Sequence, residues 1–183
     1  MIDTGGGGNT VIKTTRQPNI YDWDLDKNPA NHQPLTPLNF LPRAASVYPD
    51  KIAVIDGNKH YSYRQFYERC RRLASALKNR GVGLGDTVAL MAPNVAAMLE
   101  AHYGVPMAGA VLNALNYRLD GETIAAILNH GEAKVLITDR ELSAAVKDAL
   151  ARVGRDILVI DIDDPQADGG DLVGEMDYEA FLA

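Results

Sequence analysis

The sequence has few of the residues that build disulfide or metal frameworks. Its 183 residues include a single cysteine, Cys70, and four histidines. One thiol excludes a disulfide-stapled fold and a cysteine-based zinc site. No two histidines stand at a short metal-ligand spacing, so we expect no metal site. Cys70 falls in the apolar stripe of a predicted helix, which indicates a buried, inert thiol rather than a nucleophile.

The sequence also lacks the signatures of membrane, secreted and nucleic-acid-binding proteins. No apolar run approaches the ~18 residues of a membrane helix, and residues 1–10 have no signal-peptide pattern. The net charge of −6 gives little support to a nucleic-acid partner. Hydrophobic residues (46%) and charged residues (23%) are in the usual range of globular proteins. These features predict a chain without a transmembrane segment, and its default location is the cytoplasm.

Charge is distributed unevenly along the chain. Residues 156–183 contain nine Asp and Glu and no Lys or Arg, which leaves residues 1–155 with a net charge of +3. A Ca²⁺-binding loop would need carboxylates at the D-x-[DN]-x-[DN]-G spacing with a closing Glu, and this segment does not have it. We therefore expect the run from Asp161 to Asp171 to be a solvated loop.

Residues 1–36 have the composition of an extended N-terminal arm. They combine a run of four glycines, Gly5–Gly8, with Pro18, Pro29 and Pro34, which disfavours long helices and central strands. A phosphate-binding glycine loop needs a strand before it and a helix after it, and Gly5–Gly8 has neither.

From Pro37 onward, strand and helix patterns alternate. The expected elements are a helix over 37–48, a strand over 51–56 that pairs back with Tyr61, a helix over 62–80, a strand over 86–92, a helix over 94–107, a strand over 110–115, a helix over 120–130, a strand over 134–138, a helix over 141–153, a strand over 157–160 and a helical turn from Asp177. Ser62 with Gln65 forms a capping box, and Asn94 and Asp120 are expected to cap the helices that follow them. Short links between alternating elements predict a doubly wound α/β fold with a mostly parallel sheet flanked by helices.

Ligands of such sheets bind beyond the carboxyl ends of the strands. The corresponding loops are 92–94, 116–120 and 139–140. The glycines of 81–86 follow a helix and precede a strand, the wrong order for a nucleotide fingerprint. Arg118 stands just after a predicted strand, where a guanidinium can bind a phosphate bidentately. The alternative is that Arg118 pairs with a nearby acid such as Asp120 or Glu122.

Two segments carry a family resemblance. The segments YSYRQFYERCRRLASAL and HYGVPMAGAVLNALNYRLDGETIAAILNHGEAKVLITD resemble conserved segments of AMP-forming acyl-CoA synthetases, members of the adenylate-forming superfamily. The similarity runs from about Asn31 to Ala183. It implies that residues 37–183 are the N-terminal segment of an AMP-binding large domain.

The resemblance implies an acid–CoA ligase that uses ATP, Mg²⁺ and CoA. The acid would be short- to medium-chain, aromatic or methylthio-substituted. The family's ATP loop, acyl pocket and C-terminal lysine match no segment here, so we expect no catalytic residue, no tightly bound cofactor and no activity from this chain alone. In relatives, the arginine of an N-P-R-L segment lies near the CoA phosphates. Arg118 in N-Y-R-L matches that arginine, with Tyr117 in place of proline.

Other functions remain open at this point. The chain could be a stand-alone, non-catalytic α/β binding or interaction module, or part of a nonribosomal-type adenylation domain, although the N-Y-R-L segment argues against the latter. A piece of a larger sheet domain would expose an apolar patch, which predicts self-association and a possible homodimer.

Overall fold

The computed structural model describes residues 26–183. Most of the predicted arm, including Gly5–Gly8 and Pro18, lies outside the described residues, and residues 26–36 contain no helix or strand. Thr36–Ala183 forms one compact unit. The domain boundary at residue 37 stays a prediction.

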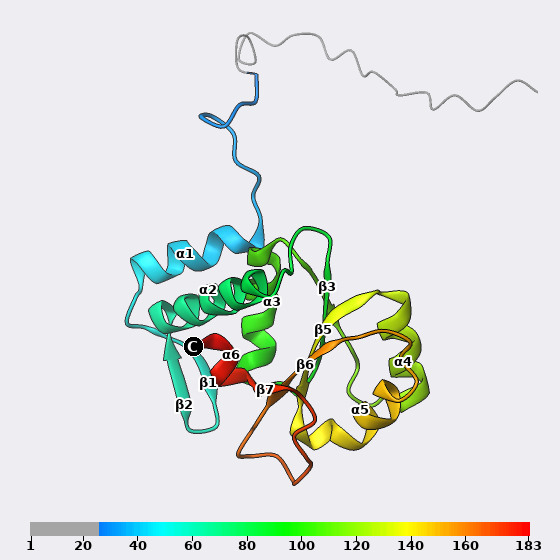
Figure 1. Cartoon of the computed structure of the whole chain (residues 1–183). Helices are drawn as coiled ribbons and strands as arrows, with labels where there is room; N and C mark the ends of the chain where they lie inside the picture. The colour runs from blue at the N-terminus through cyan, green and yellow to red at the C-terminus, as the bar shows by residue number, and fades with distance from the viewer. Residues whose placement is uncertain (1–25) are drawn as a thin grey trace, which may run out of the picture. The chain divides into compact units, whose positions relative to one another are not determined.

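Helices and strands alternate nearly as the sequence predicts (Figure 1). In chain order they are α1 (Pro37–Val47), β1 (Ile52–Asp56), β2 (Lys59–Ser62), α2 (Tyr63–Asn79), β3 (Thr87–Met91), α3 (Ala96–Ala108), β4 (Val111–Ala114), α4 (Gly121–His130), β5 (Ala133–Asp139), the 3₁₀ turn η1 (Arg140–Leu142), α5 (Ser143–Leu150), β6 (Leu158–Ile162), β7 (Met176–Asp177) and α6 (Tyr178–Leu182). The sequence did not predict β7. It also predicted one helix where η1 and the shorter α5 lie.

The main sheet has five parallel strands in the order β4-β3-β5-β6-β7. The strands β1 and β2 form a separate antiparallel hairpin, in which Tyr61 pairs with Val54. Helices α2, α3 and α6 pack on one face of the sheet, and α4 and α5 on the other (Figure 1). The predicted doubly wound α/β fold is thus confirmed.

Both faces of the central strands are buried. In β3, Val88 and Leu90 pack against the α2–α3 layer, whereas Ala89 and Met91 pack against the α4–α5 layer. This alternation follows from the period of two along a strand. It explains why the β3 sequence reads as a continuous apolar run.

The helix α2 begins and ends as predicted. Ser62 Oγ accepts a hydrogen bond from the Gln65 backbone N–H at 3.3 Å, and Gln65 Oε1 accepts one from the Ser62 N–H at 2.9 Å. Gly81, just after the helix, has a φ of +76°. Cys70 is fully buried on the inner face of α2, and burial raises the pKa of its thiol. The prediction of an inert cysteine is consistent with this position.

The predicted cap of α3 is wrong. The N-cap residue is Val95 rather than Asn94, and it makes no side-chain cap. Instead Asp56, at the end of β1, accepts a hydrogen bond from the Ala96 backbone N–H at 2.9 Å. The hairpin therefore supplies the anionic cap that the local sequence does not.

The acidic segment is not simply a solvated loop. Asp163, Asp168 and Asp171 are exposed, but Asp161 and Asp164 are buried. The strand β6 extends two residues beyond its predicted end and includes Asp161, whose Oδ2 accepts a hydrogen bond from the Gly174 N–H at 2.6 Å. Asp161 is buried because the chain returns alongside β6 as β7.

Candidate ligand-binding edge of the sheet

The three predicted ligand loops lie at one edge of the sheet. All five strands run in the same direction, so the loops after β3, β4 and β5 meet where these strands end. The strand β3 lies between β4 and β5, and α3 packs on the opposite face from α4 and α5. In doubly wound sheets, ligands usually bind where the connections of neighbouring strands leave on opposite faces.

The Arg118 loop follows β4 at this edge. Asn116 Oδ1 accepts a hydrogen bond from the Arg118 backbone N–H at 3.0 Å, which folds 116–118 into a tight turn. The Arg118 side chain is exposed, and its guanidinium carbon lies 5.6 Å from the centroid of the Tyr117 ring. The Tyr117 ring thus lies within cation–π distance of the Arg118 guanidinium.

The structure does not show the alternative pairing of Arg118. No ion pair among residues 26–183 includes Arg118. Asp120 instead caps α4, where its Oδ1 accepts a hydrogen bond from the Thr123 N–H at 2.8 Å, and this bond lowers the pKa of the Asp120 carboxyl. Arg118 therefore has an exposed guanidinium with no carboxylate partner among the described residues, which leaves it open to a phosphate.

The loop after β5 is occupied by internal contacts. Asp139 is fully buried, and burial raises the pKa of its carboxyl. One of its oxygens accepts a hydrogen bond from the Glu141 N–H at 2.9 Å. Arg140 pairs with Asp163 at 2.5 Å and donates to the Gly170 carbonyl at 3.0 Å. This loop fastens the segment after β6 to the sheet and leaves no cation free for a ligand.

A small polar cavity lies between the β1–β2 hairpin, the start of α3 and the end of β6. Its volume is about 40 Å³, and its lining includes Asp56, Lys59, Asp164 and Asp177. That volume holds one or two water molecules and not a nucleotide. The described residues also contain no group of three or more His, Cys, Asp or Glu that could hold a metal ion.

A buried charge cluster beside this cavity was not predicted. The guanidinium of Arg69 binds Glu100 on α3, with Nε 2.5 Å from Oε1, and Glu179 on α6, with Nη2 2.7 Å from Oε1. The Tyr178 hydroxyl donates to Glu100 at 2.9 Å. Burial raises the pKa of the Glu100 carboxyl, and Arg69 opposes that rise. One sequence signal could have revealed the cluster: Glu100 is the single charged residue in α3.

Comparison with known proteins identifies the family. The model described as AMP-binding enzyme matches residues 41–179. The chain belongs to the AMP-binding enzyme family. The Arg118 loop lies within the matched region, as do all five strands of the sheet.

Similar family members are named as CoA ligases. The chain is 45% identical to an acetate–CoA ligase of Humulus lupulus, over 87% of this chain and 30% of the relative. It is 54% identical to an acetate/butyrate–CoA ligase of Arabidopsis thaliana, over 69% of this chain and 22% of the relative. The chain thus spans less than a third of the length of these relatives.

A solved structure extends the likeness to three dimensions. A benzoate CoA ligase from Burkholderia xenovorans superimposes with a TM-score of 0.68 at 27% identity, over 79% of this chain and 27% of that chain. This agreement supports the resemblance to adenylate-forming CoA ligases.

The names of the sequence relatives contradict the expected cytoplasmic location. The Arabidopsis acetate/butyrate, butyrate and benzoate ligases and a Petunia hybrida trans-cinnamate ligase are all named peroxisomal. The prediction rested on the absence of a leader pattern in residues 1–10, which cannot distinguish the two compartments. Within residues 26–183, no helix has the length and apolar character needed to cross a bilayer.

Proposed function

We propose that this chain supplies the N-terminal segment of the large domain of an ATP-dependent acid–CoA ligase, with residues 37–183 as that segment. The main support for this proposal is the match to the AMP-binding enzyme model over residues 41–179, together with relatives named as CoA ligases. The parallel sheet, with Arg118 at its carboxyl edge, is compatible with this role. A peroxisomal location is part of the proposal.

The proposed reaction has two steps. The acid carboxylate attacks the α-phosphorus of ATP, which forms acyl-AMP and releases pyrophosphate. The CoA sulfur, after loss of its proton, then attacks the acyl carbon and displaces AMP to give the thioester. In this scheme the Arg118 guanidinium holds a CoA phosphate and so orients the thiol.

The substrate is a short- to medium-chain, aromatic or methylthio carboxylic acid. The names of similar relatives support the short-chain and aromatic parts of this range, since they include acetate, butyrate, 2-methylpropanoate, benzoate and cinnamate ligases. The chain alone is proposed to be inactive, because the family's ATP loop, acyl pocket and C-terminal lysine match no segment of its sequence. A homodimer is also proposed, because Ile55 and Leu99 expose apolar surface at a groove of about 380 Å³.

The test measures pyrophosphate release with ATP and a panel of these acids, using the full-length protein that contains this chain. We expect release that depends on the acid, and thioester only when CoA is added. The 183-residue chain assayed alone should give neither product. Acid-independent release, or full activity of the chain alone, would contradict the proposal.

The Arg118→Ala substitution in the full-length protein should raise the KM for CoA by about tenfold or more, because it removes a charge-assisted hydrogen bond to phosphate. The rate of acyl-AMP formation should be unchanged, since CoA enters only the second step. Arg155→Ala is the matched control, an exposed arginine after α5. An unchanged KM for CoA in the Arg118 variant would refute the assigned role.

A further inference from the structure

Positive charge is concentrated in the first two helices and the hairpin between them. Residues 37–80 contain nine of the eighteen Lys and Arg but only three of the twenty-four Asp and Glu. The whole chain is nevertheless acidic, with a net charge of −6. This part of the protein therefore attracts anions, although the chain as a whole carries net negative charge.

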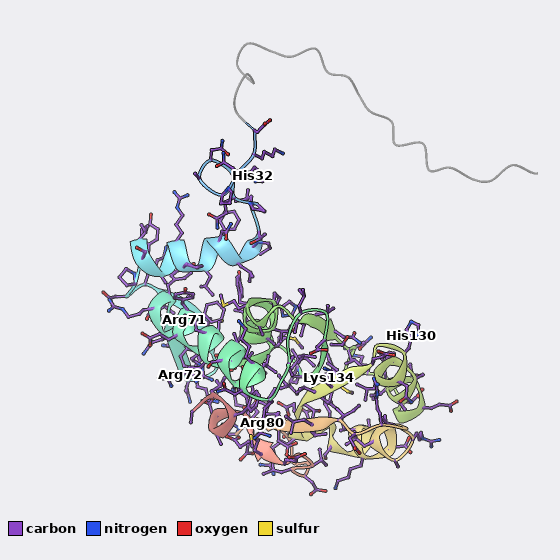
Figure 2. All side chains as sticks on the ribbon, turned by 45° about the horizontal axis from the view of Figure 1, so that its top comes forward. His32, Arg71, Arg72, Arg80, His130 and Lys134 are labelled. Carbon is purple, nitrogen blue, oxygen red and sulfur yellow. The ribbon has the colours of Figure 1, made fainter. Side chains whose placement is uncertain are left out.

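Several of these cations form no ion pair with the described residues. Arg43 on α1 and Arg71, Arg72 and Lys78 on α2 are exposed, and none forms an ion pair with any of residues 26–183. Figure 2 shows Arg71 and Arg72 on α2 at the left of the view and His130 at the right. The inward-facing Arg69, by contrast, is held by two glutamates. The free charge of α2 thus lies on its outer face.

The neighbouring helix α1 exposes large apolar side chains beside this charge. Phe40 is 55% exposed and Val47 is 56% exposed, and their spacing of seven residues places them on one face of α1. Arg43 stands between them on that face. Tyr48 is also exposed, with the Lys51 ammonium 5.7 Å from its ring centroid. Exposed apolar and basic side chains on one surface are typical of proteins that bind at the bilayer interface.

Two hollows lie along α2, and the first of them also touches α1. The first, of about 460 Å³, lies between α1 and α2 and includes Ser46, Arg64 and Arg71 in its lining. The second, of about 260 Å³, is lined by Glu68, Arg71, Arg72 and Ser75. Arg64 pairs with Asp50 at 3.3 Å, but both side chains are exposed, so that pair yields readily to a competing anion. Each hollow thus offers two arginines and a serine hydroxyl to a phosphate group, against the single carboxylate of Glu68 that lines both.

We propose that the outer face of α1 and α2 docks on an anionic phospholipid bilayer. The arginines of the hollows bind lipid phosphates, and Phe40 and Val47 enter the headgroup boundary. Charge complementarity selects an anionic partner, and the exposed apolar ridge favours lipid over nucleic acid, whose phosphate surface offers no apolar layer. The docking is peripheral and does not depend on the proposed ligase activity.

The test is co-sedimentation of the full chain with phosphatidylcholine vesicles, with and without phosphatidylserine. We expect binding to the anionic vesicles, weakened by added salt. Arg71→Gln/Arg72→Gln should lower the partition coefficient by about 25-fold, since each cation at an anionic surface contributes about a factor of five. Arg152→Gln/Arg155→Gln is the matched control, with the same change in net charge beyond α5, and should retain most of the binding.

Phe40→Ser tests the apolar contribution separately. It should lower the partition coefficient by about fivefold without changing the salt dependence, because it removes buried apolar area and no charge. Thermal unfolding of each variant checks that the fold is retained. The proposal is overturned if anionic and neutral vesicles bind equally, or if the α5-side variant loses as much binding as the α2 variant. It is equally overturned if the α2 substitutions leave vesicle binding unchanged but alter self-association of the protein without vesicles. That result would make this face a protein interface.

Discussion

Replacing Arg69 by methionine should lower the free energy of unfolding by about 3–5 kcal/mol. The substitution leaves Glu100, which is fully buried, without its cationic partner. The remaining donor, the Tyr178 hydroxyl, is neutral and cannot replace the ion pair. Glu179 also loses its partner, but it is exposed and returns to water at little cost. Chemical denaturation of both proteins at neutral pH gives the difference.

Two variants separate this effect from a general loss of arginine. Arg64→Met makes the same substitution on α2, at a pair whose members are both exposed, and should cost less than about 1 kcal/mol. Arg69→Met/Glu100→Leu removes both buried charges and should be more stable than Arg69→Met alone. If Arg69→Met is no more damaging than Arg64→Met, the buried pair has no special role.

The loss of unfolding free energy caused by Arg69→Met should become smaller as the pH falls from neutral into the mildly acidic range. Burial already raises the folded-state pKa of Glu100, and loss of Arg69 raises it further. A carboxyl whose folded pKa exceeds its unfolded pKa takes up a proton on folding, so its variant gains stability as the pH falls through the folded pKa. In the unsubstituted protein, Arg69 lowers the pKa of Glu179, so that pair stays intact through this range. A deficit that grows on acidification would contradict the assignment.

The second large effect is expected at the crossing of α2 and α3. A Cβ added at Gly104 would stand 2.7 Å from Leu73 Cδ2 and 3.0 Å from the Cys70 carbonyl oxygen. Gly104→Val should therefore lower the free energy of unfolding by about 2–3 kcal/mol, because overpacking outweighs the gain in helix propensity over glycine. Thermal or denaturant unfolding measures the loss.

The clash can be tested by giving the new side chain room. Leu73→Ala removes the side-chain atoms that the new Cβ would meet, so Gly104→Val and Leu73→Ala together should cost less than the sum of the two single changes. Gly83→Ala is the control, since a Cβ there meets nothing within 4 Å. If the two losses of unfolding free energy add strictly, the effect of Gly104→Val does not come from a clash with the Leu73 side chain.

Most of the secondary structure was predictable because its causes are local. The capping box of Ser62 and Gln65 and the Asp120 cap are each formed within four residues of sequence. The apolar stripe of α2 and the continuous apolar run of β3 predict which faces are buried, because the helix and strand periods fix where side chains point. The short β7 was missed because two residues cannot show a period.

The candidate site was only partly predictable. Position after a strand was enough to place Arg118 at the carboxyl edge of a parallel sheet. The sequence could not decide whether Arg118 pairs with Asp120, because a carboxylate can equally well cap a helix. The structure shows that Asp120 caps α4, and so the Arg118 cation is uncommitted.

The sequence by itself determined the order of the elements other than β7 and η1, the parallel α/β class and the family resemblance, since all three follow from local patterns. The tertiary structure alone decided which charges are internal. Asp56 caps a helix forty residues away, and Arg69 binds Glu179 across 110 residues. The local sequence does not distinguish a charged helix residue that faces water from one that faces a buried partner. Only the packing of α2 against α3 and α6 turns Arg69 inward and leaves Arg71 and Arg72 outside.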